Sequence, residues 1–524
     1  MSLADVMYKE KRDEMGWGTA PKNLITFQAQ PINGGAKLRW KAGHTVIDGQ
    51  MVVETKGIMF RRKEGTAPTS IYDGELVLDT EELEGSYDDE GLTNGVEYVY
   101  VAFPYSANKV FNANGGTRIT ENHPNRSACT PQAHKLYGIK VAKANSSPSG
   151  RVSYTDQAVG MTPASLNSTT GITNLGDWSE AWFVTGNKPV MMKNDGTIDY
   201  ELKANDYTKK ADGTASDISN VAYDGNAMAI IPLVWVKRWE DDSYEYTQFS
   251  NIQVDDDFHA YAHQRADGSI MDWFARSIYD ATEIGGVARS LSGYAPNNTV
   301  AGGTQLEYAQ ANGSQWDVDT WSRTTLIWDL LMLMGKSTDV QSVFGYGWYS
   351  GMSQASNLKN SGLGNSLGQF YGKAANDNLK VFHIENFWGN IWKICQGLTT
   401  NSKTQICVKM TAPYNTTGKG YHNTAIVPGG TSGGYQSAHQ NGEYGRIPKT
   451  ASGSQTTYVP DGLWFAANCF ARVGSNGNNG FLVGCAVNLN NALSNSNWNY
   501  GLAYTSCFGI ITNASQGHLH RRPL

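Results

Sequence analysis

Two histidines are the residues whose types and spacing most directly suggest chemistry. His259 and His263 stand four residues apart, and three aspartates lie just before them at 255–257. On a helix this spacing would place both imidazoles on one face, as in zinc proteases, but Ala260 stands where such an enzyme carries its glutamate. The pattern therefore favours surface polar residues, with a zinc or calcium site as the alternative, and we assign no metal ligand.

A second motif, "GTSGG" at 430–434, fits the G-x-S-x-G pattern of a serine nucleophile at Ser432. Such a nucleophile needs a strand before it and a helix after it. The flanking sequences "AIVPG" and "YQSAHQNGEYG" are typical of loops. We interpret the match as chance. No pair of carboxylates is singled out either, so no catalytic residue is assigned.

The segment "GCAVNLNNALSNSNWNYG", residues 484–501, raises a different kind of chemistry. It contains six asparagines and no charged residue. Asparagine builds helices and strands poorly, because its amide competes for backbone hydrogen bonds. On a rigid scaffold, however, Asn, Ser, Gly and Tyr are the adaptable contact residues of antibody-like binding surfaces. The alternative is a solvated loop cluster that binds nothing.

The elements that must position such a surface are mostly strands. The chain has 524 residues, 40% of them apolar, with 57 glycines and 27 tyrosines. This length favours about three domains, and the composition favours β structure with many turns. Charged residues make up 17% and the net charge is -6, without a basic stripe, so nucleic acid is not an expected partner.

The N-terminal sequence and the cysteines indicate the compartment in which the protein is made. The first residues lack the apolar core of a secretory signal, and no long apolar run suggests a membrane span. The six cysteines are scattered without a C-x-x-C pair, which favours buried free thiols over a zinc site or disulfides. We expect a protein made in a reducing cytoplasm and not inserted into a membrane.

Residues 24–106 contain short alternating strands separated by Gly and Asn turns, which predict a β-sandwich. The strand with Trp40, the "FRRKEG" strand and "GLTNGVEYVYVAF" resemble a fibronectin type III module, in which Leu92 precedes a corner tyrosine, Tyr98. The polar segment 106–130 should carry the last strand of the module and then a linker. The predicted boundaries are an N-terminal segment at 1–20, the module at 21–118 and a linker at 119–133. Such modules usually serve as spacers or adaptors.

After the linker, we expect a β-rich lead-in region at 134–225 and a larger domain at 226–524. "SRTTLIWDLLMLMG" at 322–335 predicts a buried helix with Ser322 as N-cap, and "MDWFARSIYDA" at 271–281 a shorter helix. Residues 380–397 form a dense apolar island within a glycine-, serine- and asparagine-rich region. Long irregular segments held by such islands tend to be functional.

The island contains Gly389, Asn390, Ile391 and Trp392, and this Gly-Asn-x-Trp core resembles C-type-lectin-fold proteins of the formylglycine-generating-enzyme type. Together with "VSYTDQAVGMTP", "TTLIWDLLMLMG" and "TTYVPDGLWF", it is similar to tail proteins of bacteriophages. Residues 471–501 resemble the variable region of proteins that a retroelement diversifies by misreading adenines. Asparagine codons are the sites that such misreading changes most.

The resemblance implies a mainly β fold with minor α, in which a fibronectin type III-like sandwich precedes a large C-type lectin-like α+β domain. It also implies a variable region at 464–510 whose side chains bind a ligand. The predicted ligand-binding residues are Arg472, Asn476, Asn478, Asn479, Asn488, Asn490, Asn491, Asn495, Asn497, Trp498, Tyr500 and Tyr504. By contrast, Phe481, Val483 and Val487 should hold the scaffold.

The chain departs from the enzymes and metal-dependent lectins of this fold. The enzyme binds copper through closely spaced cysteines, whereas Cys395 and Cys407 are twelve residues apart, and Lys393-Ile394 stands where the enzyme has Glu-Trp. Arg472 is the only charged residue of 464–510, which disfavours a calcium-dependent sugar site there. We therefore expect the fold without a cofactor and without that chemistry.

From these patterns we predict a receptor-binding protein at the tail tip of a phage or prophage virion. It should attach to a glycan or protein receptor on a bacterial surface, join other tail proteins through its N-terminal region, and form a homotrimer. Two alternatives remain: an enzyme on the same fold, either trimming polysaccharide or of the formylglycine type, and a purely structural baseplate protein.

Overall fold

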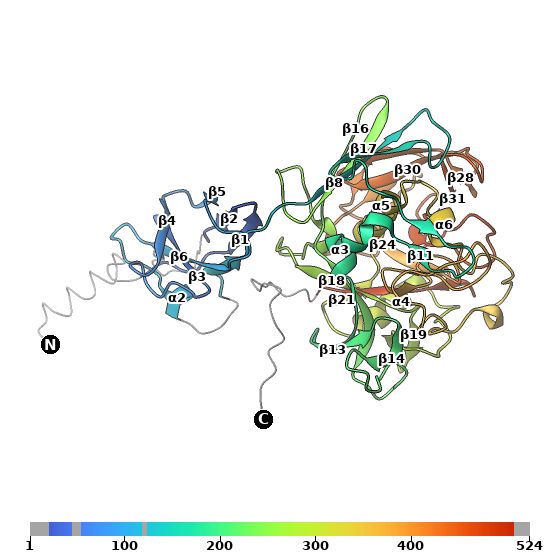
Figure 1. Ribbon diagram of the computed structural model, residues 1–524, viewed down its shortest axis with the longest axis horizontal. Helices are drawn as coiled ribbons and strands as arrows, with labels where there is room; N and C mark the ends of the chain where they lie inside the picture. Colours follow the sequence, from blue (N-terminus) through green and yellow to red (C-terminus); the bar gives the residue numbers. More distant parts are fainter. Residues whose placement is uncertain (1–19, 44–53, 118–122, 508–524) are drawn as a thin grey trace, which may run out of the picture. The chain divides into compact units, whose positions relative to one another are not determined.

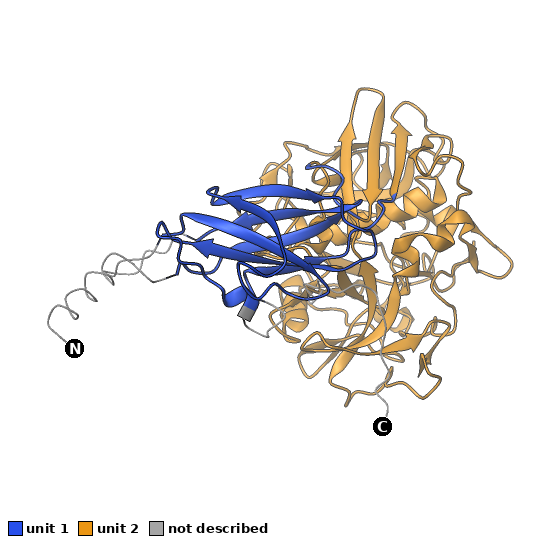
Figure 2. Cartoon of the chain, turned by 60° about the vertical axis from the view of Figure 1, so that its left-hand side comes forward, with its two compact units in different colours: residues 1–135, 252–256, 511–524 blue, residues 136–251, 257–510 orange. Residues whose placement is uncertain are grey.

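The computed structural model describes residues 20–43, 54–117 and 123–507. The prediction of a mainly β protein with minor α is confirmed. The described residues divide into two compact units (Figure 2): the first comprises those up to Lys135 together with Ile252–Asp256, and the second comprises Leu136–Asn251 and the described residues from Asp257 onward. Among the helices of the described residues, none has the length and apolar character needed to cross a membrane.

The first unit is a sandwich of two antiparallel sheets, with strand orders β1-β2-β5 and β4-β3-β6-β7. Its apolar core lies between them and includes Trp40 and Phe60, whose ring centroids are 4.9 Å apart. Tyr98 begins β6, and its hydroxyl accepts a hydrogen bond from the Thr93 backbone N–H at 3.2 Å, which is the geometry of a corner tyrosine. The elements are β1 (Thr26–Ile32), β2 (Gly35–Lys41), β3 (Gly57–Glu64), β4 (Glu75–Thr80), β5 (Glu84–Glu90), β6 (Tyr98–Tyr105), α2 (Asn114–Thr117) and β7 (Arg126–Cys129).

The predicted linker at 119–133 is wrong in part, because β7 lies within it. Tyr98 pairs with Cys129 and Val101 with Arg126, so β7 completes the larger sheet of the sandwich. Ser127 and Cys129 are buried there. The expectation that the segment 106–130 carries the last strand of the module is confirmed, and only the boundary at residue 118 is wrong, since pairing with β6 rather than local propensity fixes where the strand lies.

The second unit contains three larger sheets and several hairpins (Figure 1). One sheet has the order β14-β13-β12-β15-β18-β35-β21, a second β16-β17-β8-β9, and a third β26-β25-β24-β32-β33-β31-β28 with β34 paired to β24. The strands of the first two sheets are β8 (Leu136–Ala142), β9 (Val152–Asp156), β12 (Lys188–Lys193), β13 (Ile198–Lys203), β14 (Asp206–Lys210), β15 (Gly225–Pro232), β16 (Trp235–Glu240), β17 (Tyr244–Ser250), β18 (Trp273–Ser277), β21 (Trp316–Val318) and β35 (Tyr504–Ser506).

The third sheet is the one that carries most of the predicted variable region. Its strands are β24 (Trp392–Thr400), β25 (Ile406–Val408), β26 (His422–Asn423), β28 (Gly434–Gln436), β31 (Val459–Phe465), β32 (Phe470–Val473), β33 (Val487–Leu489) and β34 (Tyr500–Gly501). A smaller sheet joins β27 (Gly429–Gly430), β30 (Gly445–Ala451) and β29 (Ala438–Gly442), and the hairpins are β10 (Ser165–Leu166) with β11 (Thr173–Asn174), β19 (Thr282–Ile284) with β20 (Val287–Arg289), and β22 (Lys380–Val381) with β23 (Ile384–Glu385).

The predicted boundary between a lead-in region at 134–225 and a domain from 226 does not separate two bodies. Strand β8 pairs with β17 along its whole length, and β12 pairs with β15. Strands β8 and β12 end before residue 225, whereas their partners β17 and β15 begin at or after it. Both regions therefore belong to the second unit.

The helices of this unit are α3 (Trp182–Thr185), α4 (Gly302–Gln310), α5 (Trp321–Gly335) and α6 (Val340–Phe344), with short 3-10 turns at Gly176–Glu180, Tyr261–His263 and Ala355–Asn357. The predicted buried helix is confirmed as α5, although Thr320 rather than Ser322 is its N-cap. The helix predicted at 271–281 is wrong. That segment forms β18, because β15 and β35 flank it on both sides and satisfy its backbone.

Candidate functional site

The Gly-Asn-x-Trp segment, residues 389–392, is buried in the second unit and leads into β24. Gly389 has a φ of 80°, and a Cβ there would lie 2.8 Å from the backbone N and O of Trp348. Asn390 adopts a φ of 61°; its Nδ2 donates to Asp280 Oδ2 at 2.9 Å, and its Oδ1 accepts from the Lys359 N–H at 2.9 Å. These contacts fix three separate segments around the start of β24.

The charges around Asn390 are paired inside the protein. Lys393 Nζ lies 3.3 Å from Asp280 Oδ1, and both side chains are buried. Burial raises the pKa of Asp280 and lowers the pKa of Lys393, since each loses hydration of its charged form. The cluster has the character of a structural network that holds the sheet, not of a site open to a substrate.

A second buried network lies at the β22–β23 hairpin. Glu385 accepts hydrogen bonds from the backbone N–H groups of Gly362 and Gly364 at 2.9 and 2.7 Å, and Lys380 donates to Gly364 O at 3.0 Å. Burial raises the pKa of Glu385 and lowers that of Lys380. Tyr207 and His383 are also buried, and the Tyr207 hydroxyl lies 2.5 Å from His383 Nδ1. All four side chains lie in the interior and support the fold.

The other residues weighed for chemistry are held in structural contacts. His263 is buried and its Nε2 accepts from the Val234 N–H at 3.3 Å, while the His259 ring stacks on Tyr261. Ser432 Oγ accepts from the Phe465 N–H at 3.0 Å, which joins two chain segments. In the described ranges 20–43, 54–117 and 123–507, no group of three or more His, Cys, Asp or Glu side chains is placed to hold a metal ion.

Cys395 and Cys407 lie on neighbouring strands but are not opposite each other. Cys407 pairs with Thr399, which is four residues along β24 from Cys395. At about 3.3 Å per residue this separates the two positions by about 13 Å. The Cys395 thiol is instead 3.9 Å from Thr324 Oγ1, and burial raises its pKa well above the usual value.

The predicted ligand-binding residues divide into a buried and an exposed group. The prediction that the following side chains face a ligand is wrong, because they lie in the interior: Arg472, Asn476, Asn488, Tyr500 and Tyr504. Tyr504 lies in β35 between β18 and β21, with its ring 5.7 Å from Trp316. Asn488 lies in β33, where its Oδ1 accepts from the Asn490 N–H and from Asn491 Nδ2.

Arg472 shows why the single charge of the variable region is buried. Its guanidinium lies over the Tyr500 ring at 4.2 Å, and its Nη2 donates to the Asn495 carbonyl at 3.2 Å. Burial lowers its pKa. The charge therefore stabilises the loop from beneath and does not face a partner.

The exposed or half-buried group lies on two loops between the strands of the third sheet. We call residues 474–486 the first loop and residues 490–499 the second loop. The first carries Asn478 and Asn479; the second carries Asn490, Asn491, Asn495, Asn497 and Trp498. The scaffold role predicted for Val483 and Val487 is confirmed by their burial, but it is wrong for Phe481, which is 36% exposed.

The second loop has a regular attachment to the frame. Every other carbonyl accepts a hydrogen bond from a residue outside the loop. The pairs are Asn491 O with Phe470 N–H (3.0 Å), Leu493 O with Gly302 N–H (2.8 Å), Asn495 O with Arg472 Nη2 (3.2 Å), Asn497 O with Thr299 N–H (2.9 Å) and Asn499 O with Trp392 N–H (2.9 Å). The path of this loop is thus fixed through its backbone, independently of its asparagine side chains.

The exposed amides of the second loop bond mainly to one another. Asn491 Nδ2 donates to Asn490 Oδ1 at 2.5 Å, and Asn495 Nδ2 donates to Asn491 Oδ1 at 3.1 Å. Asn497 Oδ1 accepts from the N–H of the adjacent Trp498. These side chains leave donors and acceptors towards solvent, so the loop presents an uncharged hydrogen-bonding surface.

The first loop adds an aromatic cluster that the sequence did not single out. The Phe481 ring stacks on Tyr349 with centroids 4.9 Å apart, and it meets Tyr346 edge-on at 5.5 Å. Met352 N–H donates to Gly477 O at 3.1 Å, which ties the two segments together. The sequence feature that could have indicated this cluster is the run "GYGWYS" at 345–350, which has three aromatic residues among glycines.

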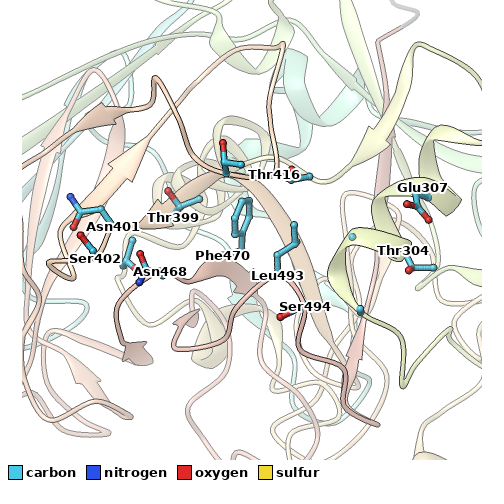
Figure 3. A pocket seen from close by; sticks show the side chains of 14 residues that line it. Thr304, Glu307, Thr399, Asn401, Ser402, Thr416, Asn468, Phe470, Leu493 and Ser494 are labelled. Atoms are coloured by element: carbon cyan, nitrogen blue, oxygen red, sulfur yellow. The ribbon is translucent and has the colours of Figure 1, made fainter.

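A groove with a volume of about 650 Å³ lies beside the second loop (Figure 3). In Figure 3 the Phe470 ring and Leu493 lie near its centre, with Asn401, Ser402 and Asn468 to one side and Thr304 and Glu307 to the other. None of these residues is among the predicted ligand-binding residues, although Asn468, Phe470 and Leu493 lie within the predicted variable region at 464–510. They come from α4, the end of β24, the loop at 416–417 and the variable region, and only folding brings them together.

Comparisons with known proteins identify no family for this chain. No protein-family model matches the chain, and no curated protein is significantly similar to it. Among solved structures, the twitchin kinase region from C. elegans is similar at 12% identity over 44% of this chain and 40% of that one, with a TM-score of 0.14. The chain thus spans less than half of that structure, and a likeness of this size supports no statement about function.

Proposed function

We propose that this chain is a receptor-binding protein at the tip of a phage or prophage tail, which attaches to a bacterial surface through its first and second loops. The observation that carries the proposal is the backbone attachment of the second loop. Its alternate carbonyls are held by the frame, so its exposed Asn490, Asn495 and Asn497 side chains are free to contact a partner. Rigid backbone with adaptable polar and aromatic side chains is the physical character of a recognition surface.

The strength of each contact argues for several copies. A neutral hydrogen bond contributes about 0.5–1.5 kcal/mol net, so one uncharged asparagine surface binds weakly. Linked copies raise the overall affinity without any new contact. We therefore propose a homotrimer, to be measured by light scattering of the full chain, with the N-terminal unit joining it to other tail proteins.

The proposal also covers the origin of the asparagines. If a retroelement diversifies residues 464–510, changes should concentrate at the exposed positions of the two loops, since changes at Asn476 or Asn488 would alter buried contacts. The test is to sequence the DNA next to the gene. It should contain a near-copy of these codons, differing only at adenines, beside a reverse transcriptase gene.

The attachment itself is tested by binding the labelled full chain to a panel of intact bacterial strains. Binding to at least one strain should be lost when Asn490, Asn495 and Asn497 are replaced together by Ala. The matched control replaces Gln455 and Thr456, which are exposed polar residues of another loop in the same unit. Equal loss in both variants, or no loss in either, would contradict attachment through the second loop.

A further inference from the structure

We propose that the groove beside the second loop binds a segment of an uncharged polysaccharide. This inference names the ligand class of the proposed attachment and rests on that function. The groove is lined by 14 residues contributed by four parts of the second unit. Its volume of about 650 Å³ falls within the range of small-ligand sites, about 300–1,000 Å³.

The polar side chains of the groove are available to a ligand. Within the described ranges, seven of them make no side-chain hydrogen bond or ion pair with another residue. They are Thr304, Glu307, Thr399, Ser402, Thr416, Asn468 and Ser494, and all of them except the buried Thr399 are exposed or half-buried. Hydroxyl groups both donate and accept, and amides present separate donors and acceptors. A ligand rich in hydroxyl groups matches this set, since each sugar hydroxyl can also donate and accept.

The charge of the groove argues for a neutral ligand. Glu307 is the single charged residue among those that line it, and Lys, Arg and His are absent from the lining. An anionic polysaccharide or a phosphate would find no cation here and would meet a carboxylate. For a sugar hydroxyl, the same carboxylate is a strong acceptor, because hydrogen bonds to an ionised group are stronger than neutral ones.

The floor of the groove is apolar. The ring of Phe470 and the side chain of Leu493 both line it, and in Figure 3 they appear between the two polar sides. A sugar ring presents C–H groups on its faces and hydroxyls at its edge, so an apolar floor between polar walls fits its shape. This arrangement of an apolar surface with a few placed polar groups is typical of binding pockets.

The walls are held before any ligand arrives. Thr400 Oγ1 donates to Ala466 O at 2.6 Å and accepts from the Cys469 N–H at 3.0 Å, which fixes the segment that leads to Phe470. Across the groove, the Gly302 N–H donates to Leu493 O at 2.8 Å. Binding to a preformed site is more favourable, because less conformational entropy is lost when the ligand binds.

The test uses polysaccharide extracted from every strain of the panel and separated by anion exchange into neutral and acidic fractions. Binding of each fraction to the full chain is measured by titration calorimetry. At least one neutral fraction should bind, and Ser494→Trp should weaken that binding at least about tenfold by filling the groove. Ser168→Trp, at an exposed serine outside the groove, is the matched control and should leave binding unchanged.

Two further variants show whether a loss of binding comes from the groove or from misfolding of a single variant. Thr416→Trp obstructs the groove from a different segment, and Glu307→Gln keeps its shape while removing the charge. Glu307→Gln should weaken binding by about tenfold, the difference between a charged and a neutral acceptor. Binding of acidic fractions alone, or neutral binding that survives both Trp substitutions in the groove, would overturn the proposal.

The outcomes separate this inference from the proposed function. If neither neutral nor acidic fractions bind while intact cells still bind the chain, the glycan assignment is wrong and surface attachment stands. Mild periodate, which cleaves vicinal diols, should then leave cell binding intact, whereas protease treatment should remove it. If neither cells nor neutral fractions bind, both proposals fail.

Discussion

The Gly-Asn-x-Trp segment and the second loop use the same amino acid in opposite ways. At Asn390 the side chain is buried and its amide bonds to Asp280 and to both backbone groups of Lys359. In the second loop the backbone carbonyls make the contacts with the frame, and the side chains of Asn490, Asn495 and Asn497 lie at the surface. In the first case the residue type determines the fold; in the second the fold holds whatever residue is present.

This difference explains how a frame and an exchangeable surface coexist within one sheet. A buried polar side chain cannot be replaced without leaving its partners unsatisfied, which costs about 1–3 kcal/mol for each group. The partners of an exposed side chain on a loop anchored by its backbone, such as Asn491 beside Asn490 and Asn495, can bond to water when that side chain is replaced. The four predictions below test this contrast through the free energy of unfolding, from the largest expected effect to the smallest.

The largest effect is expected for Asn390→Ala. The substitution leaves the Asp280 carboxylate and the Lys359 N–H without their amide partner inside the protein. We expect a loss of about 3–5 kcal/mol in the free energy of unfolding, measured by urea denaturation. Asn497→Ala, at an exposed asparagine, is the control. Similar losses in both variants would remove the contrast between the two regions.

A smaller loss is expected for Gly302→Ala, at the contact between α4 and the second loop. A Cβ there would lie 2.7 Å from Ile394 Cδ1 and 2.9 Å from the Leu493 carbonyl oxygen, so the loop must shift. Overpacking of this kind costs about 1–3 kcal/mol, which exceeds the gain of about 0.5–1 kcal/mol from removing a helical glycine.

The adjacent Gly303 provides the matched control for this prediction. A Cβ at Gly303 would have no atom within 4 Å, so Gly303→Ala should leave stability unchanged or raise it slightly. Both variants are compared by thermal unfolding. A stabilising Gly302→Ala would show that the loop is not held at this point.

The buried frame should also respond to acid through His263. Its pKa is well below the usual value because burial and the nearby Arg323 charge disfavour the protonated ring. The unfolded chain binds this proton near pH 6.5 and the folded chain does not, so stability falls as the pH drops below about 6.5. His263→Asn removes this contribution.

The measurement is the unfolding free energy of the parent chain and of His263→Asn at pH 7 and 5.5. Between these values the parent should lose about 1 kcal/mol more than the variant, because only the parent has the additional proton to bind on unfolding. His422→Asn, at an exposed histidine, is the control and should follow the parent. A parallel pH response in parent and His263→Asn would contradict the prediction.

The smallest effect on stability is expected for the combined replacement of Asn490, Asn495 and Asn497 by Ala. Exposed substitutions away from special backbone positions usually change stability by about 0.5 kcal/mol or less each. Thermal unfolding should therefore be nearly unchanged while cell binding falls. A cooperative loss of stability comparable to that of Asn390→Ala would show that these side chains belong to the frame.

Local patterns in the sequence predicted the parts of the fold that depend on near neighbours. The alternating strands and Tyr98 indicated the sandwich, and the apolar run at 322–335 indicated a helix buried on all sides. The same reasoning was wrong for 271–281, where flanking strands override a helical pattern, and for the boundary at residue 118, because β7 lies beyond it and pairs with β6.

For the candidate site, the sequence by itself determined an uncharged, asparagine-rich region near residues 464–510 and an apolar island before it. Only the tertiary structure decided that Arg472, Tyr500 and Tyr504 point inward, that Phe481 joins Tyr346 and Tyr349 at the surface, and that a groove forms beside Leu493. The physical reason is that composition reports which side chains are available to hydrogen-bond. Which of them are exposed depends on strand pairings and backbone contacts between residues far apart in the chain.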